Sequence, residues 1–186
     1  IEAGLRVRSN VDGHVLDFDG AAYWIQKRNM VIPIGMDDYR QAGKVESRGL
    51  DLALRYSAPR FVGVDIMYAL NFAEFKEYVS ADPVSGDNQS LRGRRPGFTP
   101  RHSAQAWLRL SLTDHLGFGI GGRWTAHQYA DDENRVPMPN YALLDMSAWI
   151  RGEMVSLTVS ARNVLDEHEY FTSSINSYAL NPQVTP

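Results

Sequence analysis

Residues 155–171 read VSLTVSARNVLDEHEYF, and the first half of this stretch indicates the fold class. Apolar and polar side chains alternate without interruption from Val155 to Arg162. A period of two places one kind of side chain on each face of a β-strand, whereas a helix needs apolar residues three or four positions apart. The stretch therefore predicts a strand, which we expect to run to residue 171.

The same alternation recurs along the rest of the chain. It is clearest from Leu50 to Tyr56, from Val62 to Phe72 and from Ala104 to Leu112, and no helical spacing competes with it. We therefore predict an all-β chain of antiparallel strands. Eight strands are expected, at residues 1–8, 14–29, 45–56, 61–79, 102–112, 116–129, 141–151 and 155–171.

The predicted connections alternate in length. Short turns are expected at residues 9–13, 57–60, 113–115 and 152–153, and long loops at residues 30–44, 80–101 and 130–140. When consecutive strands are neighbours, this order gathers the short turns at one end of the sheet and the long loops at the other. Outer-membrane β-barrels have this layout. Soluble up-and-down barrels can have long loops too, but rarely all at one end.

Two of the short turns also predict strand registers. The turn at residues 113–115 sets apolar side chains of one strand opposite apolar side chains of the next. The pair at 152–153 suits a two-residue type II′ turn, since its first residue is glycine. That turn sets Asp145 opposite Ser160 and leaves Asp145 diagonal to Arg162.

Composition narrows the class of protein. The 186 residues suffice for one domain, and the lack of cysteine excludes disulfides and thiolate metal sites. A net charge of -3 argues against nucleic acid as a partner. No stretch approaches the ~20 apolar residues of a membrane helix, and we expect no signal peptide because residue 1 already lies in a strand-like segment. A membrane strand exposes only alternate residues to lipid, so hydropathy does not separate a membrane barrel from a soluble one.

The two faces of the predicted sheet differ in polarity. In a soluble barrel the apolar face points inward, and in a large membrane barrel it meets lipid. The segment at residues 61–79 is longer than the usual ~3–10 residues of globular strands, which favours a membrane barrel. So do Trp24 and Trp124, which lie on the apolar face as in an aromatic girdle. Asp145 and Arg162 place a pair of opposite charges on the other face, as expected for the water-filled lumen of a membrane barrel.

Residues 163–171 resemble the N-(L/V)-(F/L)-D-x-x-Y signature near the C-terminus of TonB-dependent outer-membrane receptors. Other pieces follow in the order expected of that family, and this order makes the match specific. These pieces are Glu2-Ala3-Gly4-Leu5, KRNMV at 27–31, GKVESRGLDL at 43–52, Pro100-Arg101-His102 and PNYALLD at 139–145.

This resemblance implies a transmembrane β-barrel of 22 strands in the bacterial outer membrane, with an N-terminal plug domain in its lumen. Residues 1–186 would be the C-terminal portion of that barrel and supply about eight of its strands, the fourteenth to the twenty-first. The plug domain, the TonB box, the early strands and the final strand would be absent. The long loops would face the outside of the cell and the short turns the periplasm.

The resemblance also implies a function. The intact receptor would import ferric siderophores, and this segment would supply barrel wall, lumen surface and extracellular loops without enzymatic activity. The forms of residues 43–52 and 100–107 most resemble ferric-siderophore receptors, while haem, cobalamin and carbohydrate stay open as cargo. The expected partners are the siderophore, the TonB complex through the missing N-terminal region, and outer-membrane lipid with lipopolysaccharide.

Candidate cargo-binding residues lie in the predicted loops. Guanidinium groups pair with carboxylate and catecholate oxygens and stack on aromatic rings. The alternative is a loop that is merely solvated or that binds lipopolysaccharide phosphates. The candidates are Arg92, Arg94, Arg95 and Phe98 in one loop, Tyr39 and Arg40 in another, and Tyr178 and Asn181 near the C-terminus.

The signature residues Asn163, Asp166 and Tyr170 are expected to have a structural role. Asn and Asp satisfy backbone groups where a strand bends or bulges. The five histidines form no pair at i, i+2 or i, i+4, so we expect no metal site and no cofactor.

Three alternatives remain open. The first is a small independent outer-membrane barrel with a structural or adhesion role, and the second is a soluble lipocalin-like barrel that binds a ligand inside. The third is an outer-membrane hydrolase that uses His127 and Asp132. In isolation, the strands at residues 1–8 and 155–171 would be unpaired edges, which we expect to self-associate or to close the sheet.

Overall fold

The computed structural model describes residues 1–29, 31–33, 39–41, 43–59, 61–81 and 88–168, and its main feature is one antiparallel sheet. Eight strands lie in the order β1-β2-β5-β6-β9-β10-β13-β14, so each strand pairs with the next long strand along the chain. Their bounds are β1 Glu2–Val11, β2 His14–Arg28, β5 Lys44–Ser57, β6 Val62–Glu77, β9 His102–Ser111, β10 Leu116–Thr125, β13 Tyr141–Arg151 and β14 Ser156–Ala161.

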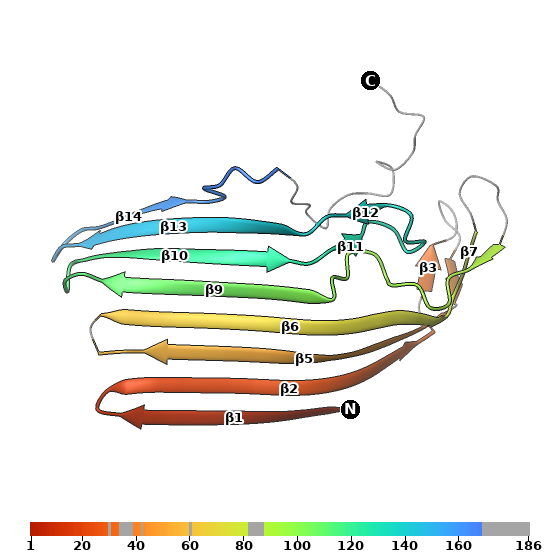
Figure 1. The fold of residues 1–186 in the computed structure, drawn as a ribbon, viewed down its shortest axis with the longest axis horizontal. Coiled ribbons are helices and arrows are strands. Elements are labelled where there is room, and N and C mark those ends of the chain that lie inside the picture. Colours follow the sequence, from red (N-terminus) through yellow and green to blue (C-terminus); the bar gives the residue numbers. More distant parts are fainter. Residues whose placement is uncertain (30, 34–38, 42, 60, 82–87, 169–186) are drawn as a thin grey trace, which may run out of the picture.

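Three small hairpins belong to the long connections. They are β3 (Val31–Pro33) with β4 (Tyr39–Gln41), β7 (Val79–Ala81) with β8 (Asn88–Ser90), and β11 (Gln128–Tyr129) with β12 (Pro137–Met138). All three lie at the same end of the main sheet, and the short turns lie at the other end (Figure 1). The predicted separation of long loops from short turns is confirmed.

The predicted eight-stranded antiparallel architecture is confirmed, with corrections at several strand ends. The first hairpin turns through Asp12 and Gly13 alone, because Val11 pairs with His14. Both turn residues have positive φ angles, 53° and 80°, as a type I′ turn requires. The strand predicted at residues 61–79 ends at Glu77, and the one predicted at 116–129 ends at Thr125.

The last predicted hairpin is wrong in its register and in its second strand. Arg151 pairs with Ser156, and the amide of Gly152 donates to the carbonyl of Val155 at 2.7 Å, so the tip of the turn is Glu153 and Met154 instead of Gly152 and Glu153. Ser147 therefore lies opposite Ser160. This shift by two residues preserves the faces. The strand predicted to reach residue 171 ends at Ala161, because positive φ angles at Asn163 and Asp166 turn the chain.

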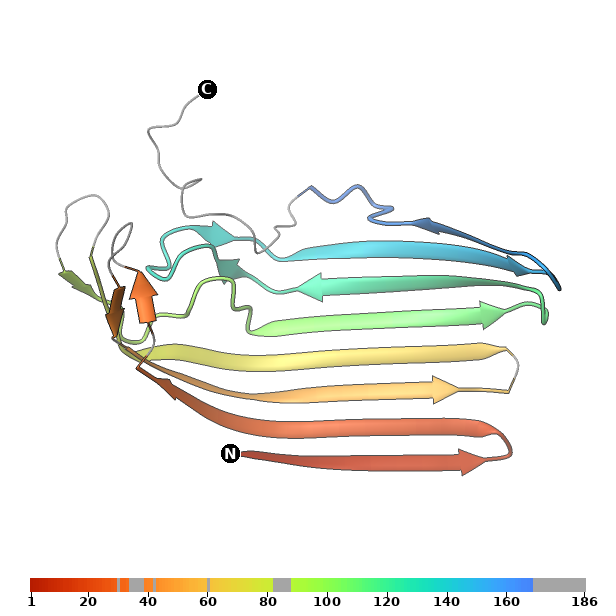
Figure 2. The ribbon, with the colours of Figure 1, turned by 180° about the vertical axis from the view of Figure 1, so that it is seen from behind.

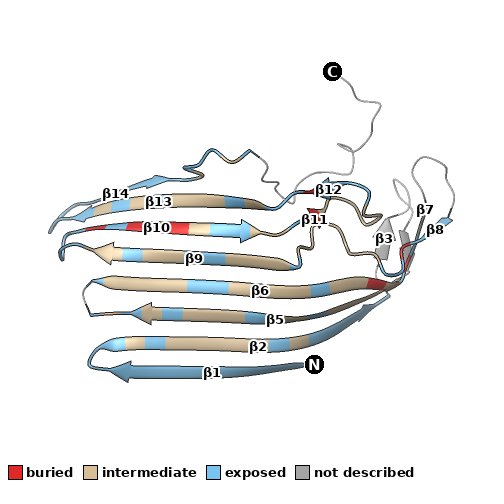
Figure 3. Cartoon of the chain, viewed as in Figure 1, coloured by how far each residue is buried: buried red, intermediate tan, exposed pale blue. Residues whose placement is uncertain are grey.

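The sheet forms a single layer. In two opposite views, no other element of the described residues covers either face of the long strands (Figures 1 and 2). Few side chains are buried, and most of the sheet is intermediate or exposed (Figure 3). Ile66 and Phe118, in the middle of the apolar face, are 42% and 37% exposed. A compact soluble domain buries such residues, so this apolar face requires an apolar environment from outside the sheet.

The buried cluster among the described residues lies under the loops. Phe75 at the end of β6 packs with Tyr78 and Leu91, and Val45 of β5 contacts the cluster. The rings of Phe75 and Tyr78 lie 4.7 Å apart. This small core fixes the chain around β7 and β8 to the extended ends of β5 and β6. In the described part of the chain, no helix is long and apolar enough to cross a membrane.

Candidate functional site

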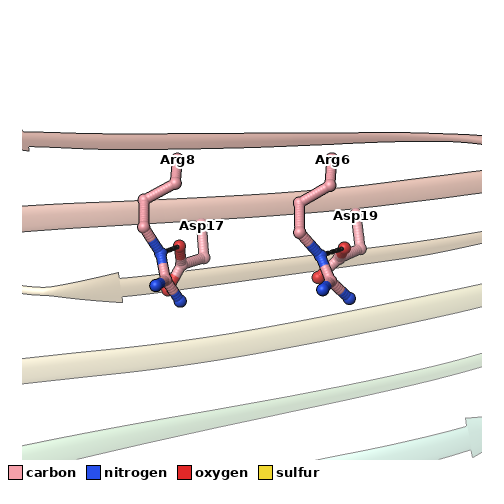
Figure 4. Close-up of polar contacts among 4 residues, drawn as sticks. All are labelled: Arg6, Arg8, Asp17 and Asp19. Atoms are coloured by element: carbon pink, nitrogen blue, oxygen red, sulfur yellow. Dashed lines mark hydrogen bonds and ion pairs between the residues drawn. The ribbon is translucent and has the colours of Figure 1, made fainter.

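Charged side chains of the polar face form a row of alternating sign near the short turns. Arg6 and Arg8 of β1 reach across to Asp19 and Asp17 of β2, and each guanidinium contacts one carboxylate (Figure 4). Asp17 lies opposite Arg55 of β5 in the strand register. The row is a consequence of period-two patterning in neighbouring strands, which brings opposite charges side by side on one face.

Asp65 continues this row on β6. Its two carboxylate oxygens accept one bond each, from Arg55 of β5 at 2.8 Å and from Arg109 of β9 at 2.8 Å. The side chain of Asp65 is only 18% exposed, while both arginines are more than half exposed. Further along the sheet, Arg123 of β10 pairs with Asp145 of β13 at 3.1 Å. Arg162, the predicted partner of Asp145, lines the same small pocket as Asp145 and Arg123.

A stripe of glycines makes room for tryptophans on the same face. Gly117, Gly119 and Gly121 of β10 are buried. A Cβ atom at Gly121 would lie 1.6 Å from the ring of Trp107, and one at Gly117 would lie 2.3 Å from the ring of Trp149. The two indoles therefore lie flat over the strand. The two indoles cover the backbone of β10 and project little above the polar face.

The polar face is also the hollow one. A trough of about 900 Å³ runs across β1, β2, β5, β6, β9 and β10. Two rows of polar-face residues form its walls, and among them Gly4, Ala21, Ala53 and Ala69 are small. A hollow, ion-paired face opposite an apolar face is the arrangement of a membrane barrel wall with a water-filled lumen.

At the other end of the sheet, two long connections are joined into what we call the loop platform, residues 91–101 with residues 126–138. Asn134 connects the two segments. Its Oδ1 accepts a bond from the amide of Arg95 at 2.9 Å, and its Nδ2 donates to the carbonyl of Arg95 at 2.7 Å. Its φ angle is 56°, which asparagine tolerates better than most residues. The guanidinium of Arg94 donates to the carbonyl of Glu133.

Asp131 and Asp132 complete the platform. The carboxylate of Asp131 accepts bonds from the amides of Arg135 and Val136 at 3.0 and 2.9 Å, which closes the turn between β11 and β12. Asp132 accepts a bond from the amide of Gly97 at 2.8 Å. Burial raises the pKa of Asp132, and the Gly97 amide opposes this shift. The charges of Glu133 and Asp131 raise the pKa further.

The comparison with protein families identifies this architecture. The family model described as "TonB dependent receptor-like, beta-barrel" matches residues 1–164. The chain belongs to the TonB-dependent receptor β-barrel family. Proteins of this family lie in the bacterial outer membrane.

Curated relatives of the chain include siderophore receptors. A ferrioxamine receptor of Yersinia enterocolitica is 30% identical over 138 residues, which are 69% of this chain and 18% of that protein. A ferrioxamine B receptor of Salmonella typhimurium is 27% identical over 150 residues, which are 78% of this chain and 20% of that protein. The chain thus spans about a fifth of the length of these relatives.

Solved structures share the fold. The siderophore receptor PiuA from Acinetobacter baumannii superposes with a TM-score of 0.73 at 20% identity, over 89% of this chain and 24% of that chain. The ferric yersiniabactin uptake receptor FyuA from Yersinia pestis gives a TM-score of 0.70 at 20% identity, over the same shares of each chain. The single-layered sheet is thus the fold of a TonB-dependent receptor barrel wall, which is open in this chain.

The structure gives the candidate cargo residues of this receptor segment different surroundings. Arg94 and Arg95 hold the loop platform together, since the guanidinium of Arg95 donates to the carbonyl of His127 at 3.1 Å and lies 5.7 Å from the ring centroid of Tyr129. Arg92 is exposed, and its guanidinium has no hydrogen-bond or ion-pair partner among the described residues. Phe98 is half-buried with a φ angle of 52°.

Other candidates are described only in part or not at all. The backbone of Tyr39 and Arg40 belongs to β4, where Tyr39 pairs with Pro33 and Arg40 with Ile32. Tyr170, Tyr178 and Asn181 lie outside the described residues.

The side chain of Asn163, which belongs to the family signature, bonds the backbone of Glu167 across the turn after β14. The backbone amide of Asn163 donates to Asp145 at 2.9 Å, its Nδ2 donates to the carbonyl of Glu167 at 2.9 Å, and its Oδ1 accepts from the amide of Glu167 at 2.9 Å. Asp166 donates its amide to the carbonyl of Asn163 at 3.0 Å. Asn163 thus closes this turn, and Asp145 fixes the turn to β13.

Sequence reasoning missed the residues that join the loops. Asn134, and the contact of Arg135 with Gln89 at 2.7 Å, connect segments far apart in the chain. The asparagine within the acidic run 131–134 was a signal for a tight turn, but nothing in the sequence indicated its partner. No group of three or more His, Asp or Glu side chains among the described residues has an arrangement that would hold a metal ion.

Proposed function

We propose that the chain is part of an outer-membrane transporter that imports ferric siderophores. It supplies eight strands of barrel wall, a stretch of lumen surface and parts of three loops on the outer side. The observation that carries the proposal is the pair of opposed faces. The apolar face has no cover within the sheet, and the concave face carries paired charges. This is the sheet of a TonB-dependent receptor wall.

Two observations support a ferric siderophore as the cargo: the names of the relatives and the structure of the loop platform. Relatives over most of the chain are named ferrioxamine receptors. In this chain the platform holds two loops in a fixed arrangement and leaves the guanidinium of Arg92 exposed. An exposed arginine on an ordered loop suits capture of an oxygen-rich chelate, since guanidinium binds such oxygens in a fixed geometry. Ferrioxamine B is therefore the first cargo to test.

The remaining parts of the transporter belong outside this chain. We place residues 1–186 in the C-terminal portion of the barrel, and the plug domain and the TonB contact in the region before it. In this arrangement the polar face, with its ion pairs and flat tryptophans, faces the plug. The role of the segment is binding and containment, without bond-breaking chemistry.

The test uses a bacterial strain from which the gene is deleted, grown without other iron sources. The full-length protein is expected to restore uptake of ⁵⁵Fe-ferrioxamine B, and a second deletion that removes TonB is expected to abolish that uptake. Arg92→Gln is expected to weaken uptake at low cargo concentration. Arg151→Gln, which removes an exposed charge at the short-turn end of the sheet, is the matched control.

Two results would contradict the proposal. Uptake that persists without TonB would exclude the energised mechanism. If the full-length protein restores no uptake of ferrioxamine B, ferric yersiniabactin or a catecholate chelate, while it is present and folded in the outer membrane, the siderophore cargo is wrong.

A further inference from the structure

The loop platform has three acidic side chains, and all three are half-buried. Asp131 accepts bonds from two backbone amides of its own turn at 3.0 and 2.9 Å. Asp132 accepts a bond from the amide of Gly97 at 2.8 Å, and burial raises its pKa, which favours the neutral form. Glu133 follows them in the same turn. Much of the negative charge of the platform is therefore directed at its own backbone.

The arginines of the platform keep their charge. The guanidinium of Arg94 donates to the carbonyl of Glu133, and that of Arg95 donates to the carbonyl of His127 at 3.1 Å. A carbonyl is neutral, so these bonds hold the guanidinium groups in place without cancelling their charge. Burial and the nearby charge of Arg101 both lower the pKa of Arg95, so these two cations lie close enough to repel each other.

The balance of charge on the platform is positive. Residues 91–101 contain four arginines and no acidic residue, while residues 126–138 contain one arginine and three acidic residues. The net charge of the two segments is therefore +2 with histidine neutral. Exposure increases the difference, because Arg92, Arg101 and Arg135 are exposed and the three acidic residues are not. The platform thus presents a cationic surface to an approaching solute.

Arg92 combines a fixed backbone with an accessible guanidinium. It is the second residue of a tight turn that is closed by a bond from the amide of Arg94 to the carbonyl of Leu91 at 2.9 Å. Gly93 follows with a φ angle of 81°, as a type II turn requires. Leu91 is buried against Phe75, whose carbonyl accepts a bond from the amide of Gly93 at 2.8 Å. The turn is therefore anchored on β6, and the guanidinium of Arg92 has no hydrogen bond or ion pair among the described residues.

We propose that the loop platform selects among ferric chelates by charge, and that Arg92 binds a free carboxylate of the preferred chelate. Chelates with an ammonium group in place of that carboxylate are bound more weakly. This inference rests on the proposed function and names the class of cargo within it. A guanidinium binds a carboxylate through paired N–H groups and has no acceptor for an ammonium group. The other arginines add a positive potential that acts over about 8 Å at physiological salt, so it also disfavours cations that make no contact.

Three forms of one chelate separate the effect of charge from that of the iron core. Ferrioxamine B has one free amino group, which is protonated at neutral pH. Acetylation of this group removes the positive charge, and succinylation replaces it with a carboxylate. The hydroxamate groups around the iron stay the same. The affinity of each ⁵⁵Fe-labelled form for the purified full-length protein in detergent is measured by equilibrium dialysis, at low and at high salt.

The succinylated form is expected to bind at least about fivefold more tightly than ferrioxamine B at low salt, with the acetylated form between them. High salt is expected to reduce this ratio, because it screens exposed charges. Arg92→Gln is expected to reduce the ratio to about twofold, since only the more distant arginines remain. Arg92→Lys keeps the charge and loses the paired geometry, so an intermediate ratio is expected. Arg151→Gln, at the short-turn end of the sheet, is the control and is expected to leave the ratio unchanged.

Two results would overturn the charge preference and leave siderophore import intact. The first is binding of all three forms with equal affinity, or tighter binding of ferrioxamine B than of its succinylated form. The second is a preference that Arg92→Gln leaves unchanged, because another part of the receptor would then determine it. If none of the three forms binds to the folded full-length protein, the proposed cargo is wrong and the charge preference is wrong with it.

Discussion

At the residue scale, the connection between the two long loops depends on the hydrogen bonds of Asn134. Replacing it with alanine removes two hydrogen bonds to Arg95, each worth about 1 kcal/mol net, and places an alanine at a positive φ angle. Asn134→Gly removes the same bonds without the backbone strain. We expect both variants to lower the free energy needed to open the platform. In the glycine variant the decrease is about 2 kcal/mol, which raises the hydrogen-exchange rate of the Arg95 amide roughly thirtyfold.

Hydrogen exchange at the amide of Arg95 measures this opening directly. Alanine is expected to have the larger effect, since it adds strain to the loss of bonds. If the glycine variant exchanges at the rate of the unchanged protein, the side chain of Asn134 does not hold the loops together.

Asp132 gives the platform a pH dependence. Burial raises the pKa of this carboxyl above its usual value, so the closed loop binds a proton more tightly than the open loop does. The contribution of Asp132 to closure is therefore fully present below the ordinary carboxyl pKa of about 3.9 and is lost as the pH rises through the raised pKa. Asp132→Asn stays neutral and keeps an oxygen for the Gly97 amide.

We expect Asp132→Asn to protect the Gly97 amide at pH 7 better than the unchanged protein does, and to remove the pH dependence between pH 4 and pH 7. Exchange rates corrected for their intrinsic pH dependence measure both effects. If protection of the Gly97 amide in the unchanged protein increases with pH, the predicted direction of the pH dependence is wrong.

The residues of the platform also show the limit of sequence reasoning about the site. Arg94 and Arg95 were predicted as cargo contacts from their charge, because the composition of a loop gives no information about its tertiary partners. The acceptors of both guanidinium groups are backbone carbonyls more than thirty residues away. Arg92 has the same chemistry and stays exposed, so its role in cargo binding remains a prediction.

At the element scale, β10 depends on glycine where Trp107 lies across it. A Cβ atom at position 121 would lie 1.6 Å from the Trp107 ring, whereas one at position 122, on the other face, would lie 3.7 Å from its nearest neighbour, the carbonyl oxygen of Leu143. Gly121→Ala must displace the indole, and overpacking of this kind costs about 1–3 kcal/mol. Gly122→Ala is the matched control, with an expected effect within about 0.5 kcal/mol.

Unfolding of the full-length protein in detergent, followed by tryptophan fluorescence, measures the difference. We also expect a shift in the emission maximum of Gly121→Ala, because the indole moves toward water. Equal stability of the two alanine variants would show that Trp107 does not pack against the glycine stripe.

Most strands could be predicted from the sequence because one observable, the alternation of side chains, decides them. It placed β5, β6 and β13 within one or two residues of their ends. The last hairpin failed because alternation is unchanged by a shift of two residues, so only the turn fixes the register. The small hairpins β3–β4, β7–β8 and β11–β12 have two or three residues per strand, too few to show a period.

At the scale of the whole molecule, the sheet separates two environments. In the part of the chain that the structure describes, nothing covers the face with Leu52, Leu54 and Ile66, while the face with Asp65 and Arg109 carries ion pairs. A soluble lipocalin-like barrel would place the apolar residues inside and the charges in bulk water. The polar face is the hollow one, which argues for lipid outside and water inside. The strands β1 and β14 lie at the two edges, and their self-association in isolation stays a prediction.

The most direct test of this account is the environment of each residue along β5. The chain has no cysteine, so a single cysteine placed in turn at positions 50–55 is unique within this region and accepts one nitroxide label. The full-length protein is reconstituted in bilayers, and label accessibility is measured with oxygen, which partitions into lipid, and with a water-soluble nickel chelate. We predict high oxygen accessibility at 50, 52 and 54 and lower oxygen accessibility with contact to water at 51, 53 and 55. High oxygen accessibility at 51, 53 and 55 in place of 50, 52 and 54 would contradict the placement of lipid on the apolar face. So would shielding of positions 50, 52 and 54 from both reagents.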